Sequence, residues 1–497
     1  HHTTAPKDRI PFFQKAIYGV GSFVNQFAGA SINQLIVVLN AGLGVNPVLV
    51  GWIGAIPRFI DAFSDPLIGY SSDNSRTKYG RRRPWIFFGA IVSGIMLALM
   101  FQLHQGHSEK FYFAYVLAIQ CLFVISFACF SIPWIALGYE MTPDYHERTR
   151  LQAFASFFAQ PVWIISAWFF AIMSTNTLEL KIWNFSLGTI HTGFTDIVDG
   201  ARVLAIIVGI FILVGGILPA LFNKEIYGNL PRVEKEKGYL NIIIDLWRNC
   251  ATSFKCLPFV KLCAVTFLIF NGFQLASAFT FYVMCFYLYG GAQPNGDTSA
   301  MNVMWHSGGM LMGVFGSVSA LCTCGAITLT TWLSSKLGKR NAFLIAMTLA
   351  IIGYGLKWIG YNPGNPYLLL IAAPFLGFHL GALFTLVPSM VADVCDYDEL
   401  QTGTRREGMY SGIYWWIQKL GMAGASVIGG YLLNWTGFNI GAGIIQPPST
   451  LFLMRLCDVG IPIVTTLIAI YIIATFEVSE DKAYEIRKQL EAKRGKA

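Results

Sequence analysis

The stretch RFIDAFSDPLIG at residues 58–69 sets three charged side chains inside a long, mostly apolar run. Arg58, Asp61 and Asp65 are separated by three and four residues, a spacing that puts all three on one face of a helix. A charge at the centre of a bilayer costs at least about 2.5–3.5 kcal/mol, so this face must point at a bundle interior or a watered cavity. The stretch therefore predicts a membrane-spanning helix that carries a polar site.

The composition of the whole chain agrees with a membrane protein. Of its 497 residues, 55% are hydrophobic and only 12% are charged. Soluble proteins carry about 25% charged residues, because their surface must face water. The net charge of +8 does not indicate a nucleic-acid partner, since the basic residues fall in short loops between apolar runs. The predicted surroundings are the lipid bilayer.

Apolar runs long enough to cross a membrane recur along the chain. A helix needs about 20 such residues to span the hydrocarbon core. Twelve runs satisfy this, and they predict an all-α membrane protein with twelve transmembrane helices in two six-helix halves. The predicted spans are roughly 14–40, 47–72, 84–104, 111–138, 152–174, 201–223, 258–288, 308–335, 342–361, 367–391, 408–434 and 451–476.

A polar segment and an internal repeat divide the chain into halves. Gly80-Arg81-Arg82 follows the second span, as Gly338-Lys339-Arg340 follows the eighth. A similar acidic motif follows the fourth and tenth spans, and together the matches indicate a duplicated six-helix unit, as in major-facilitator transporters. The predicted parts are an N-terminal half (1–223), a cytoplasmic central loop (224–257), a C-terminal half (258–476) and a cytoplasmic tail (477–497).

The positions of lysine and arginine predict the orientation. With the N-terminus inside, 28 of the 35 basic residues lie on the cytoplasmic side. Short cytoplasmic loops carry such an excess, so both termini are predicted to be cytoplasmic. The expected location is the plasma membrane, crossed many times, most naturally a bacterial inner membrane.

No enzyme chemistry is visible in the sequence. There is no nucleophile–base pair, no metal-binding motif and no phosphate-binding loop, and the ten cysteines lack the spacing of metal ligands. We therefore expect a protein that is not an enzyme and uses no cofactor, with no metal beyond a sodium ion at Asp61 and Asp65.

The charged face of the second span predicts cation coupling. If Arg58 pairs with one aspartate as a structural ion pair, the second carboxylate needs another partner. Lys419, inside the span at 408–434, is the natural one. Two facing carboxylates hold a spare negative charge that a proton or a sodium ion can neutralise. A purely structural ion pair is the alternative.

These residues resemble the signature of a known family. Asp61-x-x-x-Asp65-Pro66-x-x-Gly69, then Asp73, then Gly80-Arg81-Arg82-Arg83-Pro84-Trp85, is similar to the glycoside–pentoside–hexuronide:cation symporters, the melibiose permease family. A second marker, Ala392-Asp393-x-x-Asp396-Tyr397-x-Glu399, lies in the other half, and the resemblance covers nearly the whole chain. It implies that Asp61 and Asp65 bind the coupling cation, with Arg58 in the same site and Lys419 coupled to it.

The chain departs from that family where the sugar and sodium bind. Gln26, Ser131 and Ser156 stand where melibiose-type members have two aspartates and an arginine, and Trp134 lies beside the position of a tryptophan. Ala128 replaces a threonine that helps to hold sodium, which favours a proton without excluding sodium. Galactoside specificity therefore does not transfer.

The predicted function is symport of a sugar, glycoside or uronide with a proton or sodium ion by alternating access, in a monomer. Candidate substrate-binding residues are Asn25, Gln26, Ser131, Trp134, Ser156, Thr385 and Trp415. Polar residues within spans can instead form interhelical hydrogen bonds, and aromatic residues can instead sit at the membrane interface. A lysolipid symporter of the same fold is the alternative function, and a receptor that retains a transporter fold is a third.

Overall fold

The computed structural model describes residues 9–494 apart from several short segments. The segments left out are 76, 142–144, 175–176, 183–184, 192–193, 195, 226–240, 242–243, 245–247, 249–250, 252–253, 291–297, 403–406 and 479. Some further side chains are also left out, those of Asp73 and of residues 145–150 among them.

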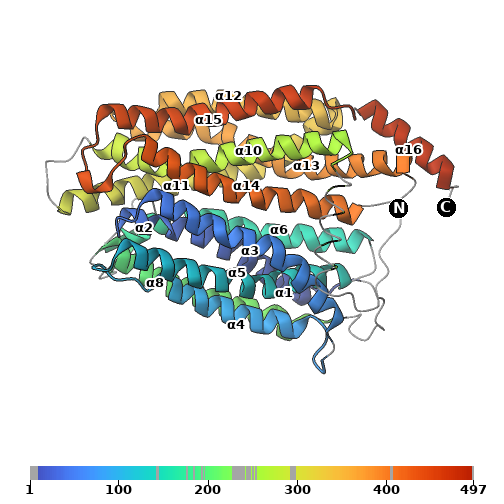
Figure 1. The fold of residues 1–497 in the computed structure, drawn as a ribbon, viewed down its shortest axis with the longest axis horizontal. Helices are drawn as coiled ribbons and strands as arrows, with labels where there is room; N and C mark the ends of the chain where they lie inside the picture. Colours follow the sequence, from blue (N-terminus) through green and yellow to red (C-terminus); the bar gives the residue numbers. More distant parts are fainter. Residues whose placement is uncertain are drawn as a thin grey trace. The chain divides into compact units, whose positions relative to one another are not determined.

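Long helices dominate the described chain, and all twelve predicted spans coincide with them (Figure 1). The fold class predicted from the sequence is thereby confirmed. The elements of the first half are α1 (Phe12–Leu35), α2 (Val37–Ala41), α3 (Pro47–Asn74), α4 (Arg83–Met100), α5 (Glu109–Glu140), α6 (Tyr145–Ala167), α7 (Phe169–Met173) and α8 (Ile197–Phe222). Those of the second are α10 (Leu257–Tyr282), η2 (Val283–Tyr289), α11 (Thr298–Leu337), α12 (Lys339–Gly360), η4 (Pro366–Ala372), α13 (Ala373–Thr402), α14 (Glu407–Trp435), η5 (Ile440–Ala442) and α15 (Pro448–Ala474), followed by α16 (Glu480–Arg494).

The chain forms two compact units. One contains His1–Ile242 and Pro294–Gly313, and the other contains Ile243–Gln293 and Val314–Ala497. The opening part of α11 thus belongs with the first unit, where Trp305 packs edge-on against Phe170 of α7 with ring centroids 5.6 Å apart. The predicted limits of the two halves, the loop and the tail stay predictions.

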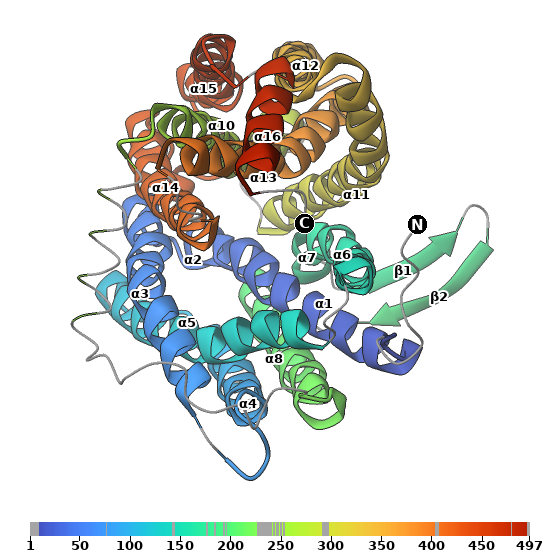
Figure 2. The same ribbon diagram turned by 90° about the vertical axis from the view of Figure 1, so that its right-hand side faces the viewer.

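In the first unit α4 lies beside α5 and α8, as Figure 2 shows. Glycines allow α4 and α8 to touch through their backbones. A methyl group added at Gly94 would lie 2.6 Å from the carbonyl oxygen of Gly209, and one added at Gly209 would lie 2.5 Å from that of Gly94. Side-chain contacts essentially never come this close, so this glycine seam between α4 and α8 excludes any Cβ.

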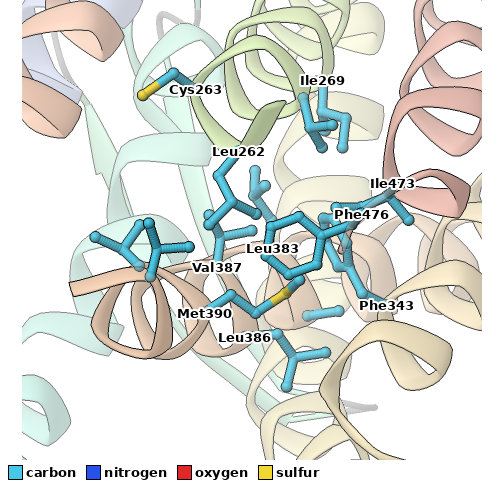
Figure 3. Packing of buried hydrophobic residues seen from close by; sticks show 14 of the residues in the cluster. Leu262, Cys263, Ile269, Phe343, Leu383, Leu386, Val387, Met390, Ile473 and Phe476 are labelled. Atoms are coloured by element: carbon cyan, nitrogen blue, oxygen red, sulfur yellow. The ribbon is translucent and has the colours of Figure 1, made fainter. Parts of the chain in front are cut away.

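The second unit has a continuous apolar core made by α10, α12, α13 and α15. Leu262, Phe343, Leu383, Met390 and Ile473 are each almost completely buried in it (Figure 3). Phe476 and Ile486 join this core from beyond α15, so α16 packs back onto the unit.

The motifs that begin at Gly80 and at Gly338 have similar structural roles in the two units. Gly80 and Gly338 have φ values of +110° and +79°, a conformation that suits glycine. Arg83 then donates to the carbonyls of Ala220 and Leu221 at the end of α8 (2.5 and 2.7 Å), and Arg340 donates to the carbonyl of Ala474, the last residue of α15. An arginine three residues after Gly80 and one two residues after Gly338 therefore cap the final helices of the two halves, although the two arginines are not at matching positions of the repeat.

Two local features were not predicted. Strands β1 (Thr177–Ile182) and β2 (Phe185–His191) pair antiparallel as a hairpin between α7 and α8. Helix α10 continues into a π-helical segment, η2, at Val283–Tyr289. Neither changes the helical class.

Candidate functional site

Helix α3 carries the charged face predicted from the sequence. It begins at Pro47, capped by Asn46, whose side-chain oxygen accepts the N–H of Val48 at 2.9 Å. Arg58, Asp61 and Asp65 are half-buried along it, and Arg58 interacts electrostatically with Asp61. The helix also contains two internal prolines, which lack N–H groups and so deprive backbone carbonyls one turn earlier of their helical partner. The charged face thus lies on a helix whose own hydrogen-bond ladder is interrupted.

Helices α3 and α14 fall outside the set of helices that are apolar enough to cross a membrane. Among the described residues, nine helices are long and apolar enough to cross a membrane by length and composition alone. The helix of Arg58, Asp61 and Asp65 is not one of the nine, and neither is α14, which contains Lys419. Both helices are therefore less apolar than most of the long helices, and each carries one or more of the charged residues predicted to form the site.

Lys419 lies in the second unit, in the middle of α14, and is half-buried. Like Arg58, Asp61 and Asp65, it takes part in at least one polar, ring or electrostatic interaction. Its pairing with the carboxylates of α3 stays a prediction.

Two of the predicted substrate residues meet each other. The Ser131 hydroxyl on α5 donates a 2.6 Å hydrogen bond to the side-chain oxygen of Asn25 on α1. Both side chains are half-buried. The pair joins α1 to α5, and it leaves the amide nitrogen of Asn25 as a further donor.

Close packing against α1 fixes the position of the Trp134 ring. Its ring stacks on Tyr18 with centroids 4.7 Å apart, and 4% of the residue is exposed. A methyl group at Gly21 would overlap the indole nitrogen, so α1 and α5 close around the ring. In this arrangement Trp134 supports the helices that carry Asn25 and Ser131, and its contact with substrate stays a prediction.

The remaining candidates lie on separate elements. Gln26 on α1 and Ser156 on α6 are exposed, and so is Trp415 on α14 at 50%. Thr385 on α13 donates its hydroxyl to the carbonyl of Gly381 at 2.7 Å, a bond within its own helix. Their roles in binding stay predictions.

A buried charge cluster in the second unit was missed by the sequence analysis. Lys357 of α12 and Asp458 of α15 form a 2.8 Å ion pair, with side chains 3% and 0% exposed. The hydroxyls of Thr280 and Tyr361 also donate to the Asp458 carboxylate, at 2.6 and 2.5 Å. The carboxylate is therefore satisfied by three donors from α10, α12 and the turn after α12.

Two motifs singled out in the sequence have definite partners. The backbone N–H groups of Arg81 and Arg82 donate to the carboxylate of Glu225, and Arg81 lies 3.8 Å from it through Nε. Lys339 forms a 2.6 Å ion pair with Asp393. No group of three or more His, Cys, Asp or Glu side chains that could hold a metal occurs among the described residues.

Comparison with curated proteins finds sugar and lipid transporters. The chain is 24% identical to the isoprimeverose transporter of Lactiplantibacillus pentosus, over 92% of this chain and 87% of that protein. It is 24% identical to the glucuronide carrier protein homolog of Escherichia coli, over 94% and 93%. It is also 23% identical to the sodium-dependent lysophosphatidylcholine symporter 1 of Mus musculus, over 99% and 90%.

The fold matches solved transporters. The nucleoside transporter NupG superposes with a TM-score of 0.61 at 12% identity, covering 92% of this chain and 98% of that one. A profile described as MFS/sugar transport protein matches residues 17–480. This match confirms the predicted resemblance and, together with the relatives, the predicted class of sugar–cation symporter. The chain belongs to the MFS/sugar transport protein family and is a multi-pass membrane protein.

Proposed function

We propose that this protein carries a sugar, glycoside or uronide across the plasma membrane together with a cation that binds at Asp61 and Asp65. The observation that carries this proposal is the charged face of α3, where two carboxylates and one arginine lie along a single 28-residue helix that coincides with the second predicted span. A charge pattern so costly in a bilayer is kept where an ion pathway needs it. Lys419 opposes cation binding by pairing with the carboxylates, and its release accompanies loading.

The coupling cation we propose is a proton. Ala128, which is 3% exposed, offers no hydroxyl ligand on α5, and the nearby hydroxyl of Ser131 is engaged with Asn25. Sodium needs several oxygen ligands, whereas a proton needs a single carboxylate of suitable basicity. Asn25 and Ser131 provide the polar contact to substrate, since their hydrogen-bonded pair retains donors suited to sugar hydroxyls.

The experiment that tests the proposal is uptake by proteoliposomes prepared from the full chain. A panel of glycosides, pentosides and uronides is offered at fixed pH with choline in place of sodium, with and without a protonophore. Uptake that persists in choline and collapses with the protonophore supports proton coupling. Uptake that requires sodium and survives the protonophore contradicts it.

Lysolipid transport is the second candidate, favoured by the similarity to the mouse lysophosphatidylcholine symporter over nearly the whole chain. The same vesicles test it when lysophosphatidylcholine is added to the panel. Accumulation of the lysolipid without accumulation of any sugar would replace the sugar proposal.

A further inference from the structure

Arg455, on α15 one turn before Asp458, is held between aromatic rings. Its guanidinium carbon lies 4.2 Å from the ring centre of Tyr287 and 4.3 Å from that of Trp358. Stacking of this kind fixes the plane of the guanidinium. The side chain is therefore pre-positioned and not loosely extended.

The positive charge of Arg455 has no carboxylate partner among the described residues. The nearest carboxylate in sequence, Asp458, is already occupied by Lys357, Thr280 and Tyr361. A guanidinium has five N–H donors. Of these, one Nη2 donor reaches the carbonyl of Trp358 at 3.4 Å, and the buried Nε of Arg455 has no hydrogen-bond partner among the described atoms.

The aromatic pair opens toward lipid. Phe452 and Leu456, the neighbours of Arg455 on α15, are 52% and 46% exposed, and Ile359, next to Trp358, is 66% exposed. Exposed apolar side chains on a membrane helix face acyl chains. Within this unit α15 packs against α10 and α12 (Figure 2). Lys419 belongs to α14. The Arg455 site is therefore on a different flank from the proposed coupling lysine.

The depth of Arg455 suits a lipid headgroup. Helix α15 has 27 residues, about 40 Å at 1.5 Å per residue, and so exceeds a hydrocarbon core of about 30 Å. Arg455 lies about two turns after the first residue of the helix, roughly 10 Å along the helix axis from that first residue. An arginine there extends its guanidinium to the interface, the level at which tryptophan and tyrosine also gather.

We propose that Arg455, with Tyr287 and Trp358, binds the phosphate of a membrane lipid whose headgroup carries a net negative charge. The two Nη atoms, of which Nη2 makes only the 3.4 Å bond to Trp358, are the donors that can bind phosphate oxygens in a bidentate manner. The π-helical segment η2 supplies Tyr287, and such segments occur often at functional sites. The bound lipid braces α10, α12 and α15 at one end of the second unit. This inference does not depend on which substrate is transported.

The test uses the full chain in nanodiscs of phosphatidylcholine with increasing phosphatidylglycerol. Lipid retained by the protein is measured by native mass spectrometry, and Tm by scanning fluorimetry. For Arg455→Gln we expect about tenfold weaker retention of phosphatidylglycerol and loss of the Tm rise that it gives. Arg455→Lys should fall between the two. The matched control is Arg202→Gln, because Arg202 has its own carboxylate, Asp199, at 3.0 Å.

Three results would overturn the proposal. One is an equal response of wild type and Arg455→Gln to phosphatidylglycerol. Another is a Tm loss in Arg455→Gln that is the same in both lipids, which means a packing role only. The third is protection of the wild type by millimolar glucuronate or inorganic phosphate in pure phosphatidylcholine, which means a site for soluble anions. If Arg455→Gln fails to fold, Trp358→Leu, which removes one stacking ring, gives the same comparison.

Discussion

At the residue scale, the two carboxylates of α3 differ from surface carboxylates in what they can do. They lie within a span beside Arg58, and an amide in place of either one removes the negative charge without changing the size of the side chain. The gradient of the cation that we propose they bind is the energy source for accumulation. The site therefore links the chemistry of single residues to the direction of transport.

We therefore predict that Asp61→Asn or Asp65→Asn abolishes concentrative uptake. Exchange of labelled for unlabelled substrate, at equal concentrations on the two sides of the membrane, should survive. Radiolabelled substrate measured in both modes checks this. Asp199→Asn is the control, because its partially exposed pair with Arg202 lies outside the site. Wild-type accumulation by both α3 variants would remove the coupling role.

The Asp458 carboxylate should matter for stability. Breaking a buried pair by removing one charge costs about 3–5 kcal/mol, because the other charge stays buried without compensation. Asp458→Asn leaves the Lys357 ammonium group buried without an opposite charge, and we expect a large fall in Tm. The partly exposed pair Arg202–Asp199 contributes only about 0–1 kcal/mol, so Asp199→Asn should leave Tm nearly unchanged. Similar Tm values for the two variants would show that the cluster is not a stability element.

At the element scale, the glycine seam between α4 and α8 sets how close two helices can come. We predict that Gly94→Ala lowers Tm, because its methyl group would meet the carbonyl of Gly209 at 2.6 Å and the helices must separate. Overpacking of this kind costs about 1–3 kcal/mol. Gly29→Ala on α1 is the matched control, since nothing lies within 4 Å of its added methyl group. In a helix it should be neutral or stabilise by about 0.5–1 kcal/mol. Equal changes in Tm for Gly94→Ala and Gly29→Ala would contradict close backbone packing at the seam between α4 and α8.

The elements themselves were largely predictable. Each of the twelve predicted spans coincides with a long helix, because the bilayer imposes a minimum length on a spanning helix whatever its tertiary contacts. The β1–β2 hairpin leaves only a weak signal in the sequence, two short runs of alternating apolar residues separated by two residues. The α3 charges were also visible, because they are local in sequence. The Asp458 cluster was not, since its partner Lys357 is 101 residues away and a single aspartate in an apolar run has no pattern. Glu225 was missed for a similar reason, as it reaches Arg81 from 144 residues away.

At the scale of the whole molecule, the distribution of basic residues predicts the topology. We expect both termini in the cytoplasm. Green fluorescent protein fused after Ala497 should fluoresce, and alkaline phosphatase fused there should be inactive. The same phosphatase inserted into the β1–β2 hairpin region should be active, because that segment is predicted to face outward. The reverse pattern of activities would invert the proposed orientation.

The glycine seam also limits where a lipid-like cargo could pass. Helices whose backbones touch leave no width for an acyl chain, whose carbon atoms need about 3.5–4.0 Å from any carbon beside them. A tail leaving the bilayer sideways into the first unit cannot slip between α4 and α8 where Gly94 faces Gly209. The contact between α4 and α8 is therefore closed to lipid, and any lateral opening for a lysolipid has to form between other helices.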